Sequence, residues 1–233
     1  MESSGSRQGN EYRRILAVGD IHGNFQRLMT LFPKIDFDPQ QDLLIFLGDY
    51  IDRGDENIHV MEWIMKQAGQ ENVIALRGNH EQMMLDHFRY HDEMWRANGG
   101  APTYRELKER ATWDKAIIDR WLAFLDERPC SYTLDVWGQV YFFCHAGVYP
   151  GVPLEEQSPE DLLWIRSAFY EHYDGRAIVV VGHTPVPMIE PGCTEPLFRS
   201  NHIIMTDTGS FMAQGRISCV DVLTWDFWQS DAD

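Results

Sequence analysis

The sequence lacks long hydrophobic runs and is poor in basic residues. No apolar stretch approaches the ~20 residues that a membrane-spanning helix needs, so we expect no membrane span. Lys and Arg number 20 against 36 Asp and Glu, which leaves a formal net charge of −16. Nucleic-acid polymers are bound largely through basic side chains that displace counterions. The charge balance therefore argues against a DNA or RNA partner.

The chain also lacks paired cysteines and the apolar segment of a secretory signal. Its four cysteines have the spacing of neither a zinc ribbon nor a disulfide framework, so we expect reduced thiols at Cys130, Cys144, Cys193 and Cys219. The polar start predicts a flexible N-terminal tail over residues 1–12 and a cytoplasmic location. Residues 13–233 are predicted to form a single domain, since mixed α/β enzymes of this length commonly fold as one unit.

Short apolar runs rich in β-branched or aromatic residues predict six strands, at Ile15–Val18, Leu43–Leu47, Asn72–Leu76, Val140–Cys144, Ile178–Val181 and His202–Met205. Because these runs are apolar on successive residues, the strands should be covered on both faces. The segments between them predict helices at Phe25–Phe32, Ile58–Gln67 and Glu81–Arg89, and the end of the chain predicts a last strand or hairpin at Arg216–Trp228. The predicted fold class is therefore α/β.

A helical insert is expected at about residues 92–128. This stretch is aromatic-rich and charged, and Asn98-Gly99-Gly100-Ala101-Pro102 marks a break within it. It carries no recognisable chemistry, and we expect it to lie beside the core.

Polar residues beside glycine follow five of the predicted strands. The segments are Gly19-Asp20-Ile21-His22-Gly23, Gly48-Asp49-Tyr50-Ile51-Asp52-Arg53-Gly54, Arg77-Gly78-Asn79-His80-Glu81, His145-Ala146-Gly147 and Gly182-His183-Thr184-Pro185. In open α/β sheets ligands gather outside the carboxyl ends of the strands, where glycine permits sharp turns. We therefore expect these groups to converge on one site.

The residue types at these strand ends predict a metal centre. The candidate ligands combine oxygen and imidazole groups without a thiolate, a set suited to Mn²⁺, Fe or Zn²⁺: Asp20, His22, Asp49, Asn79, His145 and His183. They are too many for one catalytic ion with an open position, but they divide well between two ions. If one Asp bridges ions ~3.5–4 Å apart, a shared water becomes a nucleophile at neutral pH. Five histidines outside such strand ends are expected to be ordinary packed or surface residues: His59, His87, His91, His172 and His202.

Together these segments resemble the phosphoprotein phosphatase (PPP) branch of the calcineurin-like metallophosphoesterases. The segments that begin at Gly19, Gly48 and Arg77 look like the three signature blocks of that family, and the resemblance runs from about Arg14 to Val222. Arg77–Met84 followed by Asn98-Gly99-Gly100 is most similar to the bacterial and bacteriophage lambda-type serine/threonine protein phosphatases. The resemblance implies a four-layer fold, a central mixed β-sandwich flanked by helices, with two divalent metal ions, foremost Mn²⁺, at the strand ends.

The resemblance also implies a role for each site residue. Asp20 and His22 would hold the first metal, Asp49 would bridge, and Asn79, His145 and His183 would complete the second. Arg53 and Arg166 would bind the phosphate, while His80 would be the general acid and Asp52 would orient it. The implied reaction is in-line attack by a metal-bridging hydroxide on a phosphoserine or phosphothreonine monoester, with phosphotyrosine as a further candidate. No residue is placed as a covalent nucleophile.

Two other functions stay open. Ala146-Gly147 after His145 is a form also seen among symmetrical diadenosine tetraphosphate hydrolases, whereas Glu81 after His80 resembles protein phosphatases. A catalytically inactive phosphate-binding module is the second alternative. Thr206-Asp207-Thr208-Gly209 stands where eukaryotic members carry a tyrosine-containing loop, which predicts a more open pocket. Phosphorylated proteins or peptides are the expected partners, and the sequence predicts no oligomeric state.

Overall fold

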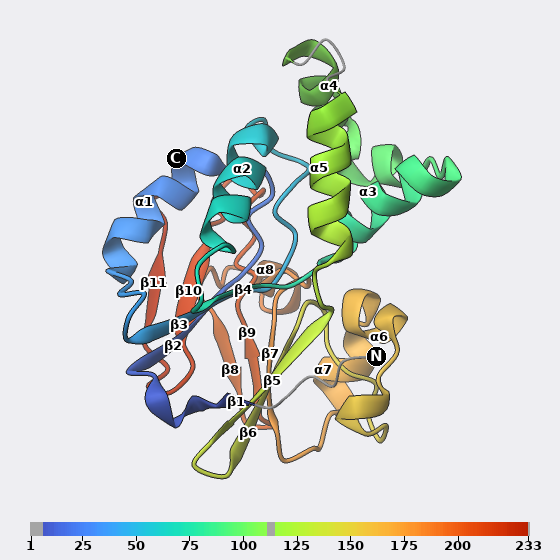
Figure 1. Ribbon diagram of the computed structural model, residues 1–233. Helices are drawn as coiled ribbons and strands as arrows, with labels where there is room; N and C mark the ends of the chain where they lie inside the picture. Colours follow the sequence, from blue (N-terminus) through green and yellow to red (C-terminus); the bar gives the residue numbers. More distant parts are fainter. Residues whose placement is uncertain (1–6, 111–114, 233) are drawn as a thin grey trace.

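Two β-sheets form the centre of the molecule in the computed structural model, which describes residues 7–110 and 115–232 (Figure 1). One sheet has five strands in the order β11-β10-β2-β3-β4, and the other has six in the order β1-β5-β6-β7-β9-β8. The strands are β1 Arg7–Gln8, β2 Arg14–Val18, β3 Asp42–Phe46, β4 Val73–Ala75, β5 Ser131–Val136, β6 Gln139–Cys144, β7 Ile178–Val181, β8 Leu197–Arg199, β9 Ile203–Met205, β10 Ser218–Asp221 and β11 Phe227–Gln229.

Both sheets are mixed, and each contains a run of parallel strands. In the first sheet β2, β3 and β4 are parallel, with Ile15 opposite Leu43 and Leu44 opposite Val73, and the antiparallel β10 and β11 complete it. In the second sheet β6, β7 and β9 are parallel. The carboxyl ends of parallel strands meet at one edge of a sheet, so each sheet presents such an edge to the loops that follow.

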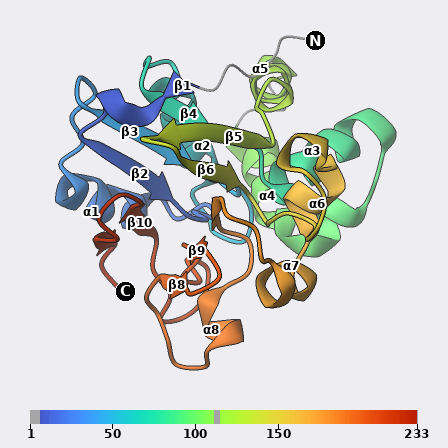
Figure 2. The same cartoon turned by 90° about the horizontal axis from the view of Figure 1, so that it is seen from below.

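Alternate residues of each strand enter different cores, because successive side chains of a strand point to opposite faces. In β2, Ile15 and Ala17 face the other sheet, whereas Leu16 packs under the helices. In β6, Phe143 faces the sandwich interior and Phe142 packs against the helices on the far side. The order is therefore helices, sheet, sheet, helices, and the predicted four-layer fold is confirmed. Figure 2 shows from below that strands of both sheets fill the centre of the molecule, with helices around them.

The helices that cover the five-stranded sheet are those expected from the sequence, with longer bounds: α1 Phe25–Ile35, α2 Asn57–Gln67 and α3 Asn79–Tyr90. The far face of the other sheet is covered by α6 Pro159–Trp164, α7 Ser167–His172 and α8 Val186–Ile189. These three helices, the short turn η3 Leu154–Glu156 and strand β5 were not predicted. A helix of one or two turns has too few residues to show a period, and β5 alternates polar and apolar residues unlike the buried strands.

The helical insert consists of the π-helical turn η2 Arg96–Gly100, helix α4 Ala101–Arg110 and helix α5 Lys115–Asp126. The expected break falls at Asn98 and Gly99, whose dihedral angles are not helical, but the chain enters α4 directly after it. Residues 1–6 of the predicted tail lie outside the described residues, while Arg7–Gln8 pair with β5 and Gly9–Glu11 form the turn η1. The division into a tail and one domain stays a prediction.

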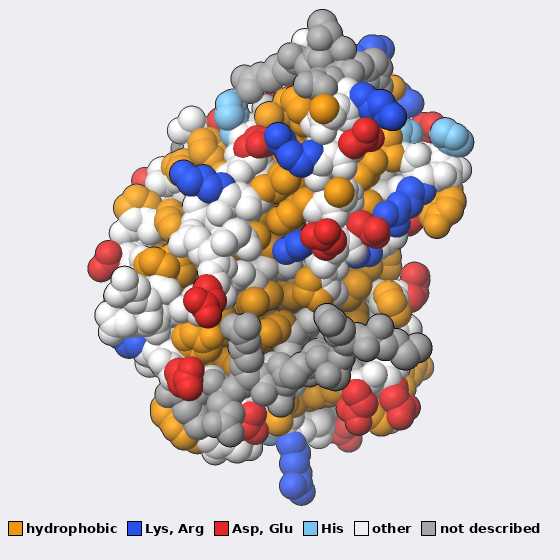
Figure 3. Space-filling view, in the orientation of Figure 1, with side chains coloured by type: hydrophobic (Ala, Val, Ile, Leu, Met, Phe, Trp, Pro, Cys, Tyr) orange, Lys and Arg blue, Asp and Glu red, His pale blue; other side chains and the backbone are white. Residues whose placement is uncertain are grey.

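No helix within the described ranges is both long and apolar enough to cross a membrane. On the face of the molecule shown in Figure 3, most Lys and Arg side chains gather over the upper half, around α2, α4 and α5, whereas Asp and Glu are spread more widely. The negative net charge is therefore unevenly distributed over this face.

Candidate functional site

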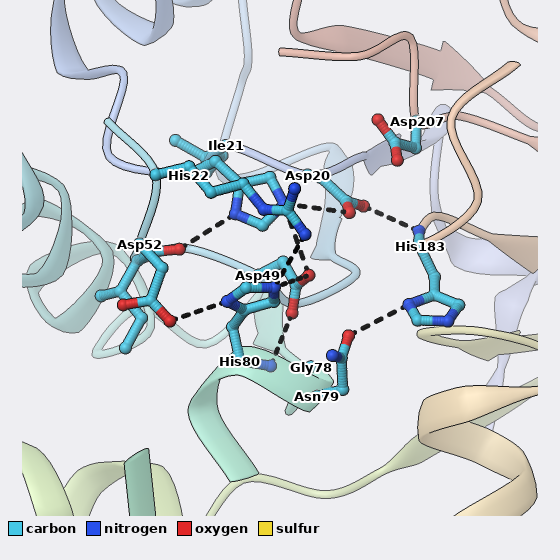
Figure 4. Close-up of polar contacts among 12 residues, drawn as sticks. Asp20, Ile21, His22, Asp49, Asp52, Gly78, Asn79, His80, His183 and Asp207 are labelled. Carbon is cyan, nitrogen blue, oxygen red and sulfur yellow. Dashed lines mark hydrogen bonds and ion pairs between the residues drawn. The ribbon is translucent and has the colours of Figure 1, made fainter. Parts of the chain in front are cut away.

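Six loops at the carboxyl ends of strands from both sheets meet at one place. Asp20 and His22 follow β2, Asp49 follows β3, Asn79 follows β4, His145 follows β6 and His183 follows β7. All six of these side chains are buried. A sixth loop, after β9, adds the buried Asp207, whose carboxylate lies near Asp20 and His183 in Figure 4. The structure therefore brings the six candidate ligands together at one place.

The ligand atoms form two groups that share Asp49. In one group, His22 Nε2 lies 3.5 Å from Asp49 Oδ2 and 3.8 Å from Asp20 Oδ2. In the other, His145 Nε2 lies 3.3 Å from Asp49 Oδ1 and 2.8 Å from Asn79 Oδ1, and His183 Nδ1 lies 3.0 Å from the same amide oxygen. Because the two carboxylate oxygens of Asp49 each face one group, this side chain has the position of a bridging ligand.

Backbone carbonyl groups fix the tautomers of two of these histidines. Nδ1 of His22 donates to the carbonyl of Ile51 at 3.0 Å, and Nδ1 of His145 donates to the carbonyl of Leu47 at 2.9 Å. A carbonyl can only accept, so the proton lies on Nδ1 in each ring and the lone pair of Nε2 faces the carboxylates. Hydrogen bonds of this kind orient metal-binding histidines and raise their basicity.

The backbone around the site is strained. Among the described residues, ten that are not glycine have a positive φ, and five of them belong to the site: His22, Asp49, Asp52, Arg53 and His183. Left-handed φ is unfavourable for such residues and clusters at functional sites. Two glycines allow the close approaches, since a Cβ at Gly78 would overlap Asp49 and a Cβ at Gly182 would overlap Asp20.

Glu81 holds the loop after β3 against the start of α3. Its carboxylate accepts hydrogen bonds from the backbone N–H groups of Asp49 and Tyr50, each at 2.8 Å, and from that of Gly78 at 2.9 Å. Glu81 therefore positions Asp49 through the backbone and does not line the cavity of the site. In the sequence, Glu81 is recognisable only as a family marker, and no local pattern reveals this role.

The buried polar groups fit two divalent cations. Asp20 Oδ2, His183 Nε2 and Asp207 Oδ2 are buried without a hydrogen-bond partner among the described residues. Burial raises the pKa of Asp20 well above its ordinary value, and the charge of Asp207 raises it further. Anionic side chains gathered out of water need cations to offset the loss of solvation. Oxygen and imidazole ligands without a thiolate suit Mn²⁺, Fe or Zn²⁺, and they do not select one of the three.

His80 lies at the edge of this cluster and pairs with Asp52. Nδ1 of His80 is 2.7 Å from Asp52 Oδ2, and both side chains are buried. Burial lowers the pKa of His80, but the charge of Asp49 and the hydrogen bond to Asp52 outweigh it, so the net shift is upward.

The helical insert holds Asp52 in place. The indole Nε1 of Trp95 donates to Asp52 Oδ2 at 2.8 Å, and the hydroxyl of Thr103 donates to Asp52 Oδ1 at 2.6 Å. Trp95 and Thr103 are fully buried. The carbonyl of Gly99 also accepts from the backbone N–H of Arg53 at 2.9 Å. The insert therefore takes part in the site. The sequence did not reveal this, because single hydrogen-bonding residues leave no motif.

Two arginines stand at the opening of the cavity, which has a volume of about 190 Å³. Arg53 Nη2 lies 3.2 Å from His80 Nε2, and Arg166 Nη1 donates to the carbonyl of His183 at 3.3 Å and to the hydroxyl of Thr184 at 3.2 Å. Both guanidinium groups line the cavity together with His22, Asp49, Asn79, His80 and His183. The structure thus brings all ten predicted site residues together.

An aromatic side chain also borders the cavity. Phe211, in the loop after β9, lies under the guanidinium of Arg53, and the Cζ atom of Arg53 is 4.0 Å from the centre of the phenyl ring. The same ring packs edge-on against His22. The buried Arg27 of α1 supports this loop by donating to the carbonyls of Ser210 and Gly215. The sequence indicates the missing tyrosine-containing loop, but no pattern in it singles out this phenylalanine. None of the five other histidines lines the cavity.

Comparisons with known proteins agree with this geometry. Residues 13–207 match the family described as calcineurin-like phosphoesterase. The chain is 33% identical to Serine/threonine-protein phosphatase 1 of Salmonella typhimurium over 188 residues, which cover 77% of this chain and 82% of the relative. It is 42% identical to Serine/threonine-protein phosphatase 2 of Escherichia coli over 159 residues, or 66% of this chain and 69% of the relative.

A solved structure of a protein proposed to be a diadenosine tetraphosphatase has the same fold, with a TM-score of 0.68 and 16% sequence identity. It covers 98% of this chain and 97% of that chain. The chain belongs to the calcineurin-like phosphoesterase family. It is therefore a phosphoesterase of a family that works with divalent metal ions, and the Asp and His clusters described above are able to hold them.

Proposed function

We propose that the protein is a serine/threonine protein phosphatase that hydrolyses phosphoserine and phosphothreonine monoesters, with phosphotyrosine as a further candidate substrate. The observation that carries this proposal is the buried His80–Asp52 pair, which faces a cavity lined by two arginines. A serine or threonine alkoxide is a poor leaving group, and a positioned general acid accelerates its departure by roughly 10²–10⁴. An inactive phosphate-binding module would have no use for such a pair.

The residues divide into two metal-binding sets. Asp20, His22 and Asp49 would hold one cation, and Asp49, Asn79, His145 and His183 would hold the other, in agreement with the two groups of ligand atoms. When bound, two divalent cations would lower the pKa of a water so that it can lose a proton and act as a nucleophile at neutral pH, and they would offset the negative charge of the phosphate. We propose Mn²⁺ as the native ion.

The remaining site residues act on the phosphate and on the leaving oxygen. Arg53 and Arg166 would each bind phosphoryl oxygens, since a planar guanidinium can offer two parallel N–H donors. His80 would donate the proton on Nε2 to the leaving oxygen, and Asp52, on the other side of the ring, keeps the imidazole oriented. Phe211 limits the swing of Arg53 by stacking against it.

Covalent catalysis by cysteine has no support at this site. Cys144 directly precedes His145, but its thiol is buried and donates to the carbonyl of Gly147 at 3.4 Å. Burial raises the pKa of this thiol far above its ordinary value, so the nucleophilic thiolate is scarce. The reaction therefore proceeds without a covalent phosphoenzyme.

A substrate panel tests the proposal against the dinucleotide alternative. The kcat/KM of the Mn²⁺-loaded enzyme is measured for phosphoserine, phosphothreonine and phosphotyrosine peptides and for diadenosine tetraphosphate. We expect the phosphoserine and phosphothreonine peptides to be the better substrates. A strong preference for the dinucleotide would replace the proposed function by that of a dinucleoside polyphosphate hydrolase, and hydrolysis of none of these compounds would favour a binding module. The cytoplasmic location stays a prediction.

A further inference from the structure

A groove of about 300 Å³ lies outside the catalytic cavity, between α3 with the start of the insert on one side and α6 on the other. In Figure 1, α3 and α6 both lie at the right of the molecule, with α3 above α6. Its lining is of two kinds: the apolar Met83, Met94 and Trp164, and the acidic Asp86, Asp92 and Glu160. None of these residues has been given a role so far.

Both walls of the groove lead into the catalytic cavity. On one wall, Met83 and Asp86 follow Asn79 on the same face of α3, at the spacing of one and two helical turns. On the other wall, Trp164 ends α6 two residues before Arg166, and its indole packs edge-on against the ring of His183, with 6.4 Å between ring centres. A chain held with its phosphate at the metal centre can therefore continue into the groove.

The carboxylates of the groove lack basic partners. No ion pair within residues 7–110 and 115–232 joins Asp86, Asp92 or Glu160 to Lys, Arg or His. Asp86 Oδ1 accepts from the side chain of Gln82 and Asp92 Oδ1 from the backbone of Met94, which leaves their other oxygens available. Arg89, one turn beyond Asp86, pairs instead with Asp126 at 2.8 Å.

The two kinds of lining residue suit one kind of occupant, a lysine or arginine side chain. Its aliphatic stem packs on apolar groups such as Met83 while its charge reaches the acidic edge of the groove. The half-buried indole of Trp164 adds a favourable surface for a cation. The acidic side chains would repel a polyanion, so the groove disfavours binding of the second nucleotide of a dinucleoside tetraphosphate.

We propose that this groove, made by Met83, Asp86, Asp92, Met94, Glu160 and Trp164, binds a basic residue of a phosphopeptide substrate close to the phosphorylated residue. Helix α3 sets the distance between the phosphorylated residue and the basic residue, because the seven residues from Asn79 to Asp86 rise about 10 Å. An extended peptide covers about 3.3–3.6 Å per residue, so the basic residue lies about three positions from the phosphoserine. The inference rests on the proposed function, since it assumes a phosphorylated peptide at the metal centre.

Matched phosphoserine peptides test the groove. Peptides that carry Arg, Ala or Glu three positions before or after the phosphoserine are compared by kcat and KM with the Mn²⁺-loaded enzyme, at low and at high salt. The same assays are run on Asp86→Asn, Asp92→Asn, Glu160→Gln and the triple variant. Glu71→Gln, an exposed acidic residue before β4, is the matched control variant. p-Nitrophenyl phosphate, which has no peptide to enter the groove, is the control substrate.

We expect the Arg peptide to have the lowest KM when the Arg stands on one side of the phosphoserine, either before or after it. Each single substitution in the groove should raise that KM by roughly two- to fivefold. The triple variant should have the same KM for the three peptides, and high salt should weaken the preference of the wild type for Arg. Hydrolysis of p-nitrophenyl phosphate should not change in any groove variant, and Glu71→Gln should keep the peptide preference of the wild type. Equal kcat/KM for all peptides with the wild type, or a preference that survives in the triple variant, would overturn the groove while the proposed function stands. Hydrolysis of p-nitrophenyl phosphate without that of any phosphopeptide would overturn the proposed function and the groove with it.

Discussion

Removing the hydrogen bonds from the insert to Asp52 should weaken the general acid without removing the metal centre. Trp95→Phe deletes the indole N–H that Asp52 Oδ2 accepts at 2.8 Å, and Thr103→Val deletes the hydroxyl that Oδ1 accepts at 2.6 Å. Thr103→Val nearly conserves shape, whereas Trp95→Phe also shortens a fully buried side chain. Neither residue is among the proposed metal ligands. After either change, the buried carboxylate of Asp52 keeps its bond to His80 but loses one of its two bonds to the insert.

The expected loss in kcat follows from the burial of Asp52, which has 0% of its surface exposed. A hydrogen bond to a charged group contributes about 1.5–3 kcal/mol to stability. If about half of one bond is lost in the transition state, kcat on an alkyl phosphate falls by about tenfold, since about 1.4 kcal/mol corresponds to a factor of ten. Together the two substitutions should approach the loss of the acid itself, roughly 10²–10⁴, and should not be additive.

The assay compares two substrates that differ in their need for a proton. Hydrolysis of a phosphoserine peptide should slow by about tenfold in each variant, while hydrolysis of p-nitrophenyl phosphate, whose leaving group is a much weaker base, should change little. Trp63→Phe is the control, because Trp63 packs in the same apolar core without a hydrogen bond to Asp52. Equal losses on both substrates, or no loss on either, would refute the reasoning that the insert acts through the acid.

The other predictions concern the bridging ligand, the acid and the stability in acid. Asp49→Asn should lower metal affinity by more than about a hundredfold and abolish turnover with it, measured by metal analysis of dialysed protein; normal metal content and turnover would contradict the bridging role. His80→Asn should keep both ions, slow a phosphoserine peptide by roughly 10²–10⁴ and largely spare p-nitrophenyl phosphate, as seen in parallel assays; equal slowing would argue against proton donation. Burial raises the pKa of Asp42, but hydrogen bonds from Arg14 and Arg13 outweigh it and lower the pKa from 3.8 to about 2. The lowered pKa means that Asp42 stabilises the fold fully above about pH 5 and loses this contribution as the pH falls towards 2. The gap in unfolding free energy between wild type and Asp42→Asn, measured with urea, should therefore shrink by at most about 2 kcal/mol between pH 5 and pH 2, and a gap that does not change would contradict it.

Elements with a strong local pattern could be predicted from the sequence. The apolar runs of β2, β3 and β7 are continuous because both faces of these strands are covered, and that continuity marks them without any knowledge of their neighbours. Strand β5 and the short helices α6 and α7 have no such signal, because their lengths and partners are set by the surface on which they pack. The loop that carries Phe211 is similar, since it is held by Arg27 from a distant helix.

The sequence by itself determined the family and the set of candidate ligand residues, because each candidate ligand lies shortly after a predicted strand and within a few residues of a glycine. Only the tertiary structure decided how these residues work together. Asp52 takes its hydrogen bonds from Trp95 and Thr103, which lie 43 and 51 residues away along the chain, and the acidic groove exists only where α3 and α6 come together. Such contacts depend on the packing of whole elements, and no short stretch of sequence records which buried donor will meet which buried carboxylate.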